Sequence, residues 1–258
     1  MSLLYQTTGI VLSRRDYRES DRWYSVYTPD RGKVEFLARG GNKPLAKLTP
    51  HLEMVAEVDL LLVYGRYYQT VAGADRKRAF TGVYEDISKH LLAQNALHLV
   101  DIGTSPNEND PNIYTLLSTW LEFLEHTPLI SKERAGFLLG AFSLKLLSLT
   151  GYRPELQNCL GCRCELQSKA FRWHALKGGV VCENCVMIDE QQWFSARPMN
   201  DEILKLARFS LQESFPELLK LHLSAQGIEG FHEAVESLVI SHFPTIPASS
   251  LRASCSVC

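Results

Sequence analysis

Two pairs of cysteines in this chain have the spacing of metal ligands. Cys159 and Cys162 form one C-x2-C pair, and Cys182 and Cys185 form a second one after 19 intervening residues. This spacing is typical of structural zinc sites, in which two tight turns each present two thiolates to one ion. Four thiolates fill the coordination shell and leave no position for water. The predicted cofactor is therefore Zn²⁺ with a structural role.

The chain has seven cysteines, an odd number, and its first residues lack the pattern of a signal peptide. Both observations favour metal binding over a disulfide framework. Cys164 could replace Cys162 as a ligand, although a spare thiol is the simpler interpretation. His174 is interpreted as a hairpin surface residue rather than a ligand. Cys255 and Cys258 form a third C-x2-C pair, interpreted first as tail thiols and second as an adventitious metal or redox site.

A hairpin and a set of helices must position these thiols. Residues 170–174 and 179–181 are predicted to form the hairpin between the cysteine pairs, with a bend at Gly178-Gly179. Asp110-Pro111 is typical of a helix start, Ser131 is a candidate N-cap, and Gly151 is a candidate helix end. Helical spacing of apolar residues predicts five helices, at about residues 87–99, 112–125, 132–149, 201–213 and 229–242.

The first part of the chain has strand-like patterning instead. Pro29-Asp30-Arg31-Gly32 and Gly65-Arg66 are candidate turns. Five short strands in so few residues favour a small closed barrel, because closure removes exposed edges. We expect an OB-fold, with an SH3-like barrel as the alternative. The predicted strands cover residues 8–12, 23–28, 33–38, 54–64 and 67–72.

The predicted fold class is therefore α+β, with an N-terminal five-stranded OB-fold barrel and an α-helical domain that carries the four-cysteine module. The predicted domains are residues 1–79, which would bind nucleic acid, and residues 80–258, with the zinc module at about 154–195.

Charge is distributed unevenly between these two parts. Residues 1–78 hold 13 Lys and Arg against 9 Asp and Glu, whereas the rest of the chain holds 14 against 20. A basic barrel indicates binding to a polyanion, and sequence-independent nucleic-acid binding comes largely from such cations. The candidate phosphate contacts are Arg14, Arg15, Arg18, Arg31, Lys33, Arg39, Lys43, Lys47, Arg76, Lys77 and Arg78.

Aromatic residues interleave with these cations, and an exposed ring could stack on a base. Strand aromatics more often lie in a core, and isolated arginines often only solvate a surface. The candidate rings are Tyr24, Tyr27, Phe36, Tyr67 and Tyr68.

No motif for catalysis or nucleotide binding occurs in the chain. It lacks the P-loop, the G-x-G-x-x-G fingerprint, the G-x-S-x-G elbow and the H-E-x-x-H zincin motif. No apolar stretch is long enough to span a membrane. We therefore expect a cytoplasmic protein that is not an enzyme, with no membrane contact and no nucleotide cofactor.

The order of several motifs resembles that of the RecO family. The resemblance covers roughly residues 5 to 190, and the residues after Gly41 depart from it, since Pro44-Leu-Ala-Lys47 stands where the family usually has a serine-containing turn. The matching segments are Gly9 to Leu12, Tyr17 to Asp21, Tyr27-Thr28, Gly32-Lys33, Ala38 to Pro44, Leu146 to Pro154, Cys159 to Cys162, Phe171 and Gly178 to Cys182.

The resemblance implies an OB-fold followed by a helical domain with a zinc module. It also implies binding to single- and double-stranded DNA and annealing of complementary strands. The partners that it implies are RecR and the C-terminal tail of single-stranded DNA-binding protein (SSB), with which RecA is loaded onto SSB-coated DNA. Such a protein of DNA repair and recombination would be associated with the nucleoid.

An SSB tail is acidic and apolar, so it requires an apolar groove with flanking cations. Lys132, Arg134 and Lys145 are the candidate cations, beside Phe137, Leu138 and Phe142. These apolar residues could equally belong to the core.

Three other functions fit part of the sequence. An RNA-binding or translation-associated protein also combines a small barrel with a zinc ribbon. An enzyme with a structural zinc module would need a substrate pocket. A scaffold could hold RecR without DNA contacts of its own.

Overall fold

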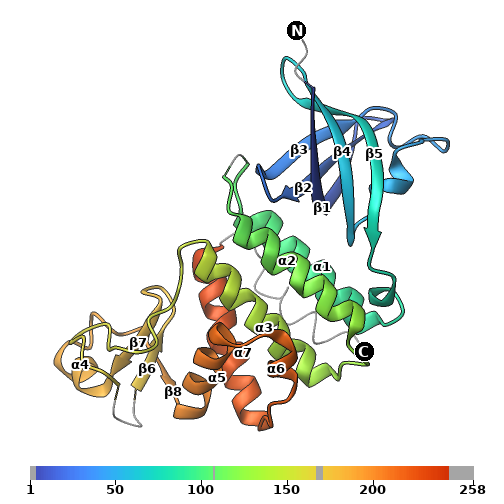
Figure 1. The fold of residues 1–258 in the computed structure, drawn as a ribbon. Coiled ribbons are helices and arrows are strands. Elements are labelled where there is room, and N and C mark those ends of the chain that lie inside the picture. The colour runs from blue at the N-terminus through green and yellow to red at the C-terminus, as the bar shows by residue number, and fades with distance from the viewer. Residues whose placement is uncertain (1–3, 107, 167–170, 244–258) are drawn as a thin grey trace. The chain divides into compact units, whose positions relative to one another are not determined.

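The chain forms two compact units, one ending at Leu129 and the other beginning at Ile130. The computed structural model describes residues 4–106, 108–166 and 171–243, and Figure 1 shows the elements of each unit. Both α and β structure are present, as predicted.

A closed five-stranded barrel forms the first part of unit 1 (Figure 1). The strand order is β1-β2-β3-β5-β4, and β1 pairs with both β2 and β4. All pairs are antiparallel except β3 with β5, which is a short parallel pair. The strands are β1 (Leu4–Tyr17), β2 (Asp21–Thr28), β3 (Gly32–Ala38), β4 (Ala56–Tyr64) and β5 (Gln69–Ala79).

The barrel interior is apolar, and its turns follow the sequence prediction. Tyr24 and Phe36 stack at 5.7 Å between ring centroids, and both are fully buried. Gly32 has φ +65°, and a Cβ there would lie 1.9 Å from the Glu108 carbonyl oxygen, so only glycine fits the β2–β3 turn. The backbone amide of Gly65 donates to the carbonyl of Tyr68 at 3.1 Å and closes the predicted β4–β5 turn.

Two strands are longer than predicted. Residues 13–17 continue β1 and residues 73–79 continue β5. Both extensions are rich in charged side chains. The backbone of Arg14 to Tyr17 pairs with β2, while the side chains of Arg14 and Arg15 face solvent.

Two helices complete unit 1. They are α1 (Ile87–Gly103) and α2 (Pro111–His126), with short 3₁₀ turns η1 (Thr49–His51) and η2 (Thr81–Val83). The side chain of Asp110 accepts a hydrogen bond from the Asn112 amide at 2.8 Å, so the predicted N-cap is confirmed. The expected domain boundary after residue 79 coincides with the end of β5, whereas unit 1 also includes both helices.

Unit 2 is built around a buried helix, α3 (Lys132–Leu149). It packs against α5 (Asp201–Gln212), α6 (Phe215–Leu219) and α7 (Ala225–His242). Gly140 permits close packing, because a Cβ there would lie 2.7 Å from the Phe231 ring. Ser131 is at the N-cap position of α3, but its side chain makes no capping hydrogen bond.

A small sheet module lies between α3 and α5 in the chain. Its sheet has the order β7-β6-β8, with β6 (Phe171–His174), β7 (Gly179–Cys182) and β8 (Arg197–Met199). The short helix α4 (Glu183–Ile188) follows β7. The sequence did not predict α4, α6 or β8, because such short elements show no periodicity. No helix in the described part of the chain has the length and apolarity to cross a membrane.

Candidate metal centre and nucleic-acid interface

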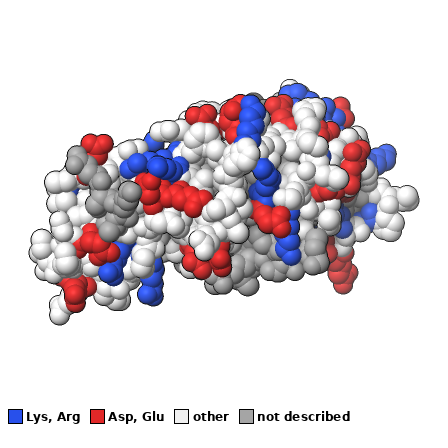
Figure 2. All heavy atoms as spheres, turned by 90° about the horizontal axis from the view of Figure 1, so that it is seen from below, with Lys and Arg blue, Asp and Glu red and all other residues white. Residues whose placement is uncertain are grey.

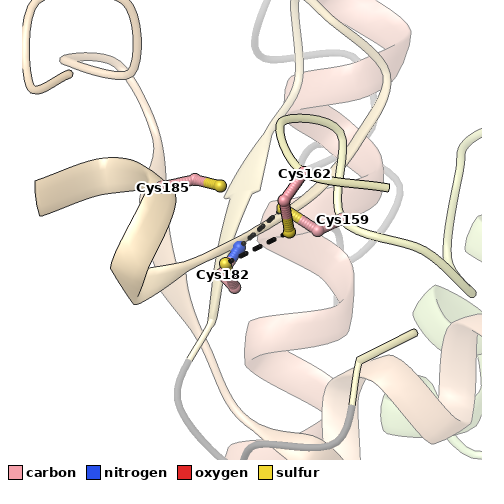
Figure 3. A group of neighbouring side chains, drawn as sticks. All are labelled: Cys159, Cys162, Cys182 and Cys185. Atoms are coloured by element: carbon pink, nitrogen blue, oxygen red, sulfur yellow. Dashed lines mark hydrogen bonds between the residues drawn. The ribbon is translucent and has the colours of Figure 1, made fainter. Parts of the chain in front are cut away.

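The structure brings the four predicted cysteines together (Figure 3). Cys159 and Cys162 lie in the loop before β6, Cys182 ends β7, and Cys185 lies in α4. All four Sγ atoms lie within 4.8 Å of one another, and those of Cys162 and Cys182 are 3.9 Å apart. Zn–S bonds of about 2.3 Å require sulfur atoms about 3.8 Å apart in a tetrahedron. The four cysteines could therefore hold a metal ion.

Backbone amides support the cluster. The amides of Gly161 and Cys182 each donate to the Cys159 sulfur at 3.3 Å and fix its position. Cys159 is buried with Val181, Val186, Trp193 and Ala196, whereas Cys162 is exposed. The site thus lies at the edge of a small apolar core.

The thiols differ in their tendency to ionise. A hydrogen bond from the backbone of Cys164 is the main factor that lowers the pKa of Cys162 to about 6. Burial is the main factor that raises the pKa of Cys185 to about 12. Four thiolates at these distances repel one another, so a bound cation is needed for all of them to be deprotonated together.

Cys164 and His174, the other candidate ligands that the structure describes, lie outside the four-cysteine group. Cys164 is exposed, and its sulfur faces the Cys162 carbonyl at 3.8 Å, in agreement with the spare-thiol interpretation. The interpretation of His174 as a surface residue is wrong, because the residue is buried. Its ring accepts from the Lys177 amide at 3.2 Å and bonds Ser195 at 3.1 Å. Cys255 and Cys258 lie outside the described residues.

Gly161 packs against the cysteine cluster, a contact that the sequence alone did not reveal. A Cβ at this residue would lie 2.8 Å from the Cys185 sulfur. We expect Gly161→Ala to lower zinc affinity by about 10–100-fold, the range seen when the surroundings of metal ligands are disturbed. Competition with a chromogenic chelator measures this change. The matched control is Gly73→Ala in the barrel, where the new Cβ would meet Leu61 at 3.4 Å, an ordinary contact. Equal zinc affinity of the two variants would contradict the prediction.

The structure gathers some of the predicted DNA-binding cations around the β3–β4 loop (residues 39–55). The Asn42 amide donates to the Ser20 carbonyl at 2.9 Å, and the Gly40 amide donates to Asp21 at 2.7 Å. These bonds bring the loop beside the β1–β2 turn, which carries Arg18. The exposed cations on these two segments are Arg18, Arg39, Lys43 and Lys47.

Arg39, Lys43 and Lys47 form no ion pair within the described residues, so their charges are available to an anionic ligand. Two further cations contact the same loop near its C-terminal end. Arg14 forms an ion pair with Glu53 at 2.8 Å, and Arg76 donates to the Pro50 carbonyl. Arg39, Lys43 and Lys47 of the loop thus lie on a segment that two further cations also contact.

Other predicted cations are engaged elsewhere. Arg31 lies at the opposite end of β2, with its guanidinium 4.1 Å from the Tyr5 ring. Lys77 pairs with Glu57 at 3.0 Å, and Arg78 pairs with Glu122 on α2. Arg31, Lys77 and Arg78 are therefore not part of the group of cations around the β3–β4 loop.

Lys33 is an internal residue rather than a surface one. Its side chain is 11 % exposed, and its Nζ lies 2.9 Å from Asp101 on α1. Ser13 and Ser25 donate to the same carboxylate at 2.8 and 2.7 Å. Burial alone would raise the pKa of Asp101, but the hydrogen bonds from Ser25, Lys33 and Ser13 outweigh it and lower the pKa. The predicted phosphate contact at Lys33 is therefore replaced by a structural ion pair.

Three of the five candidate rings are buried. Tyr24, Tyr27 and Phe36 have no exposed surface and cannot stack on a base, whereas Tyr67 is 82 % exposed. Tyr68 is half-buried and lies 6.0 Å from Trp23.

Trp23 is part of an outer aromatic cluster, with Tyr17 and Tyr68, that was not predicted from the sequence. The Trp23 ring lies 5.9 Å from Tyr17, and the Arg15 guanidinium lies 5.6 Å from its centroid. The signal was available in the alternation of β2, where Trp23 neighbours the inward-facing Tyr24 and must point outward.

The predicted SSB-tail cations do not border an open apolar groove. Phe137, Leu138 and Phe142 are buried in the core. Arg134 donates to the Leu219 carbonyl, and Lys145 donates to the Glu213 carbonyl at 2.8 Å. Lys132 alone of the three is exposed. In the view of Figure 2, Lys and Arg are interspersed with Asp and Glu.

Comparison with known proteins identifies the family. Residues 1–80 match the model "Recombination protein O N terminal", and residues 84–248 match "Recombination protein O C terminal". The chain belongs to the RecO family. The first match contains the barrel and its basic loop, and the second contains all four clustered cysteines. The resemblance seen in the sequence is thereby confirmed.

Curated relatives agree with the RecO assignment. A DNA repair protein RecO from Alkaliphilus metalliredigens is 27% identical over 97% of this chain and 98% of its own length. One from Geobacter metallireducens is 34% identical over 70% of this chain and 72% of its own. One from Symbiobacterium thermophilum is 33% identical over 70% and 71%. The chain is therefore a member of a family of DNA repair proteins.

Proposed function

We propose that this protein is a non-enzymatic mediator of DNA repair and homologous recombination. It binds single- and double-stranded DNA, anneals complementary strands, and acts with RecR to load RecA onto SSB-coated DNA. The observation that supports DNA binding best is a group of exposed cations on a loop of a closed barrel, Arg39, Lys43 and Lys47, which form no ion pair among the described residues. Family membership supports the role in repair.

The barrel is proposed to be an OB-fold. Its five strands close through β1, which pairs with β2 along one edge and β4 along the other. OB-folds are five-stranded Greek-key barrels that hold nucleic-acid strands on one side. Residues 1–79 would then be the DNA-binding domain, with residues 80–258 as the helical domain.

The DNA path is proposed to run across the loop and the outer aromatic cluster. Arg15 and Arg18 lie beside Trp23 and Tyr17, with their guanidiniums 5.6 and 5.2 Å from the ring centroids. Cations there would neutralise phosphates while a ring stacks on a base, a combination that binds single strands without reading sequence. Tyr17, Trp23 and Tyr68 are all half-buried, so one face of the cluster is accessible.

Annealing needs no bond to be made or broken. Two strands held on one basic surface repel each other less, because the cations neutralise phosphates and release counterions. Base pairing itself then supplies the free energy. This mechanism requires no nucleotide and no catalytic residue.

Zinc is proposed as the bound metal, held by Cys159, Cys162, Cys182 and Cys185. Bound zinc would neutralise the thiolates and link the loop before β6 to the β7–α4 junction. All four ligand positions belong to the protein, so the ion supports the fold only.

The proposed protein partners are RecR, the SSB tail and, indirectly, RecA, at the nucleoid in the cytoplasm. For the SSB tail, Lys132 is the candidate cation that remains exposed. Titration of a tail peptide against Lys132→Ala tests this contact, and unchanged affinity would exclude it.

Replacing Arg39, Lys43 and Lys47 with alanine tests the DNA-binding surface. Each phosphate contact to a single strand contributes about 0.7 to the slope of log K against log salt. We expect the triple variant to lower this slope by about 2 and to bind more weakly at low salt, as measured by fluorescence anisotropy. The control replaces Arg153, Lys205 and Lys220 of unit 2, which removes the same charge. Equal effects of the two triple variants would contradict the assignment.

An RNA-binding function is the alternative that this assay can also address. Competition between DNA and RNA of the same sequence distinguishes the two. Preference for RNA, together with no acceleration of DNA annealing in the absence of ATP, would favour the alternative.

A further inference from the structure

The β3–β4 loop carries an apolar side chain far out in solvent. Leu45 is 92 % exposed, and Pro44 before it is also exposed. Single exposed leucines are common on protein surfaces, so the exposure by itself indicates nothing. The surroundings of Leu45 give it significance. Figure 1 shows this loop, in blue, projecting from the barrel.

Hydrogen bonds within the loop hold the leucine in position. The Lys43 amide donates to the Gly40 carbonyl at 3.1 Å, and the Ala46 amide donates to the Lys43 carbonyl at 3.0 Å. Thr49 closes the loop by donating to the Gly41 carbonyl at 2.7 Å. Pro44 further fixes the backbone before Leu45. The exposed side chain is therefore presented on a folded loop.

The charges around Leu45 favour an anionic ligand at the loop. Lys43 and Lys47 lie two residues before and two residues after it, and neither forms an ion pair within the described part of the chain. A nucleic acid whose phosphates bind these two lysines would bring its bases to the tip of the loop. No acidic residue stands between Arg39 and Lys47 in the sequence to oppose this.

We infer that Leu45, supported by Pro44, acts as an apolar wedge that enters between neighbouring bases of bound DNA. This inference rests on the proposed DNA-binding function. Leucine and proline are among the side chains that proteins insert between base steps, where burial of the apolar group offsets the loss of stacking. A strand unstacked at this point is open to pairing with its complement, which suits an annealing protein.

Oligonucleotides that contain 2-aminopurine test the wedge, because this base brightens when it is unstacked. The probe is a single strand with 2-aminopurine at successive positions, saturated with protein. We expect the wild type to raise the fluorescence several-fold at one or a few positions. Leu45→Ala should lose at least half of this increase while its affinity keeps the same salt slope, and Leu45→Met should restore it.

Leu129→Ala is the matched control, since Leu129 is 83 % exposed but belongs to no basic loop. Wild-type fluorescence in Leu129→Ala, together with the loss in Leu45→Ala, supports the wedge. Wild-type fluorescence in Leu45→Ala with intact binding overturns the wedge and leaves the DNA-binding function standing. If the wild type itself does not bind the strand, the proposed function fails and the wedge fails with it.

Discussion

Cys185→Ser is expected to lose zinc and to unfold the small sheet module. Binding of structural zinc contributes roughly 10–16 kcal/mol to the folding of zinc-finger peptides, so loss of one of four thiolates removes a large part of the module's stability. Within the described residues, the apolar cluster that packs around the site has five buried members: Cys159, Val181, Val186, Trp193 and Ala196. So small a core does not hold a fold without its metal.

Metal analysis and thermal unfolding followed by tryptophan fluorescence measure this effect. Trp173 and Trp193 are both buried in the module and report its unfolding. The matched control is Cys164→Ser, which removes a thiol that stands outside the four-cysteine group. We expect the control to retain one zinc per chain and wild-type stability. Full zinc content and unchanged melting of Cys185→Ser would show that the structural assignment is wrong.

A feature could be predicted from the sequence when the residues that form it lie close together along the chain. The cysteine pairs were found because each pair is local and its spacing reflects the geometry of a metal site. The strands and longer helices were found for the same reason, since their periodicity extends over neighbouring residues. The order of the strands in the barrel and the position of Gly161 against Cys185 depend on distant segments and were not predicted.

The cations of the barrel show most clearly what local sequence cannot predict. Arg39, Lys43 and Lys47 were predicted as phosphate contacts, and they form no ion pair with any residue that the structure describes. Lys33 is a lysine like Lys43 and Lys47, yet it binds Asp101, which is 68 residues away. The residues next to Lys33 do not show whether its ammonium is solvated or buried, because burial depends on Asp101, a partner from a distant segment.

Asp101→Ala is the second variant with a large expected effect. It would leave the Lys33 ammonium, whose side chain is only 11 % exposed, without its counterion, and Ser13 and Ser25 without their acceptor. Removing one partner of such a pair typically costs 3–5 kcal/mol when it is fully buried, and we expect about 3 kcal/mol here. Urea unfolding of the wild type and the variant measures the difference. An exposed pair serves as the control: Asp16→Ala, which removes the partner of Arg22, should cost less than about 1 kcal/mol.

The cost of Asp101→Ala should also depend on pH. Because the folded pKa of Asp101 is lowered, its contribution is fully present above the unfolded value of about 4 and is lost as the pH falls through the folded pKa. The gap in unfolding free energy between wild type and variant should therefore narrow in acid.

Lys33→Met separates a structural role of Lys33 from a role in DNA binding, since it should lower the free energy of unfolding without changing the salt slope for DNA. If Lys33→Met kept its stability and its salt slope fell by the amount of one phosphate contact, Lys33 would bind DNA as the sequence predicted.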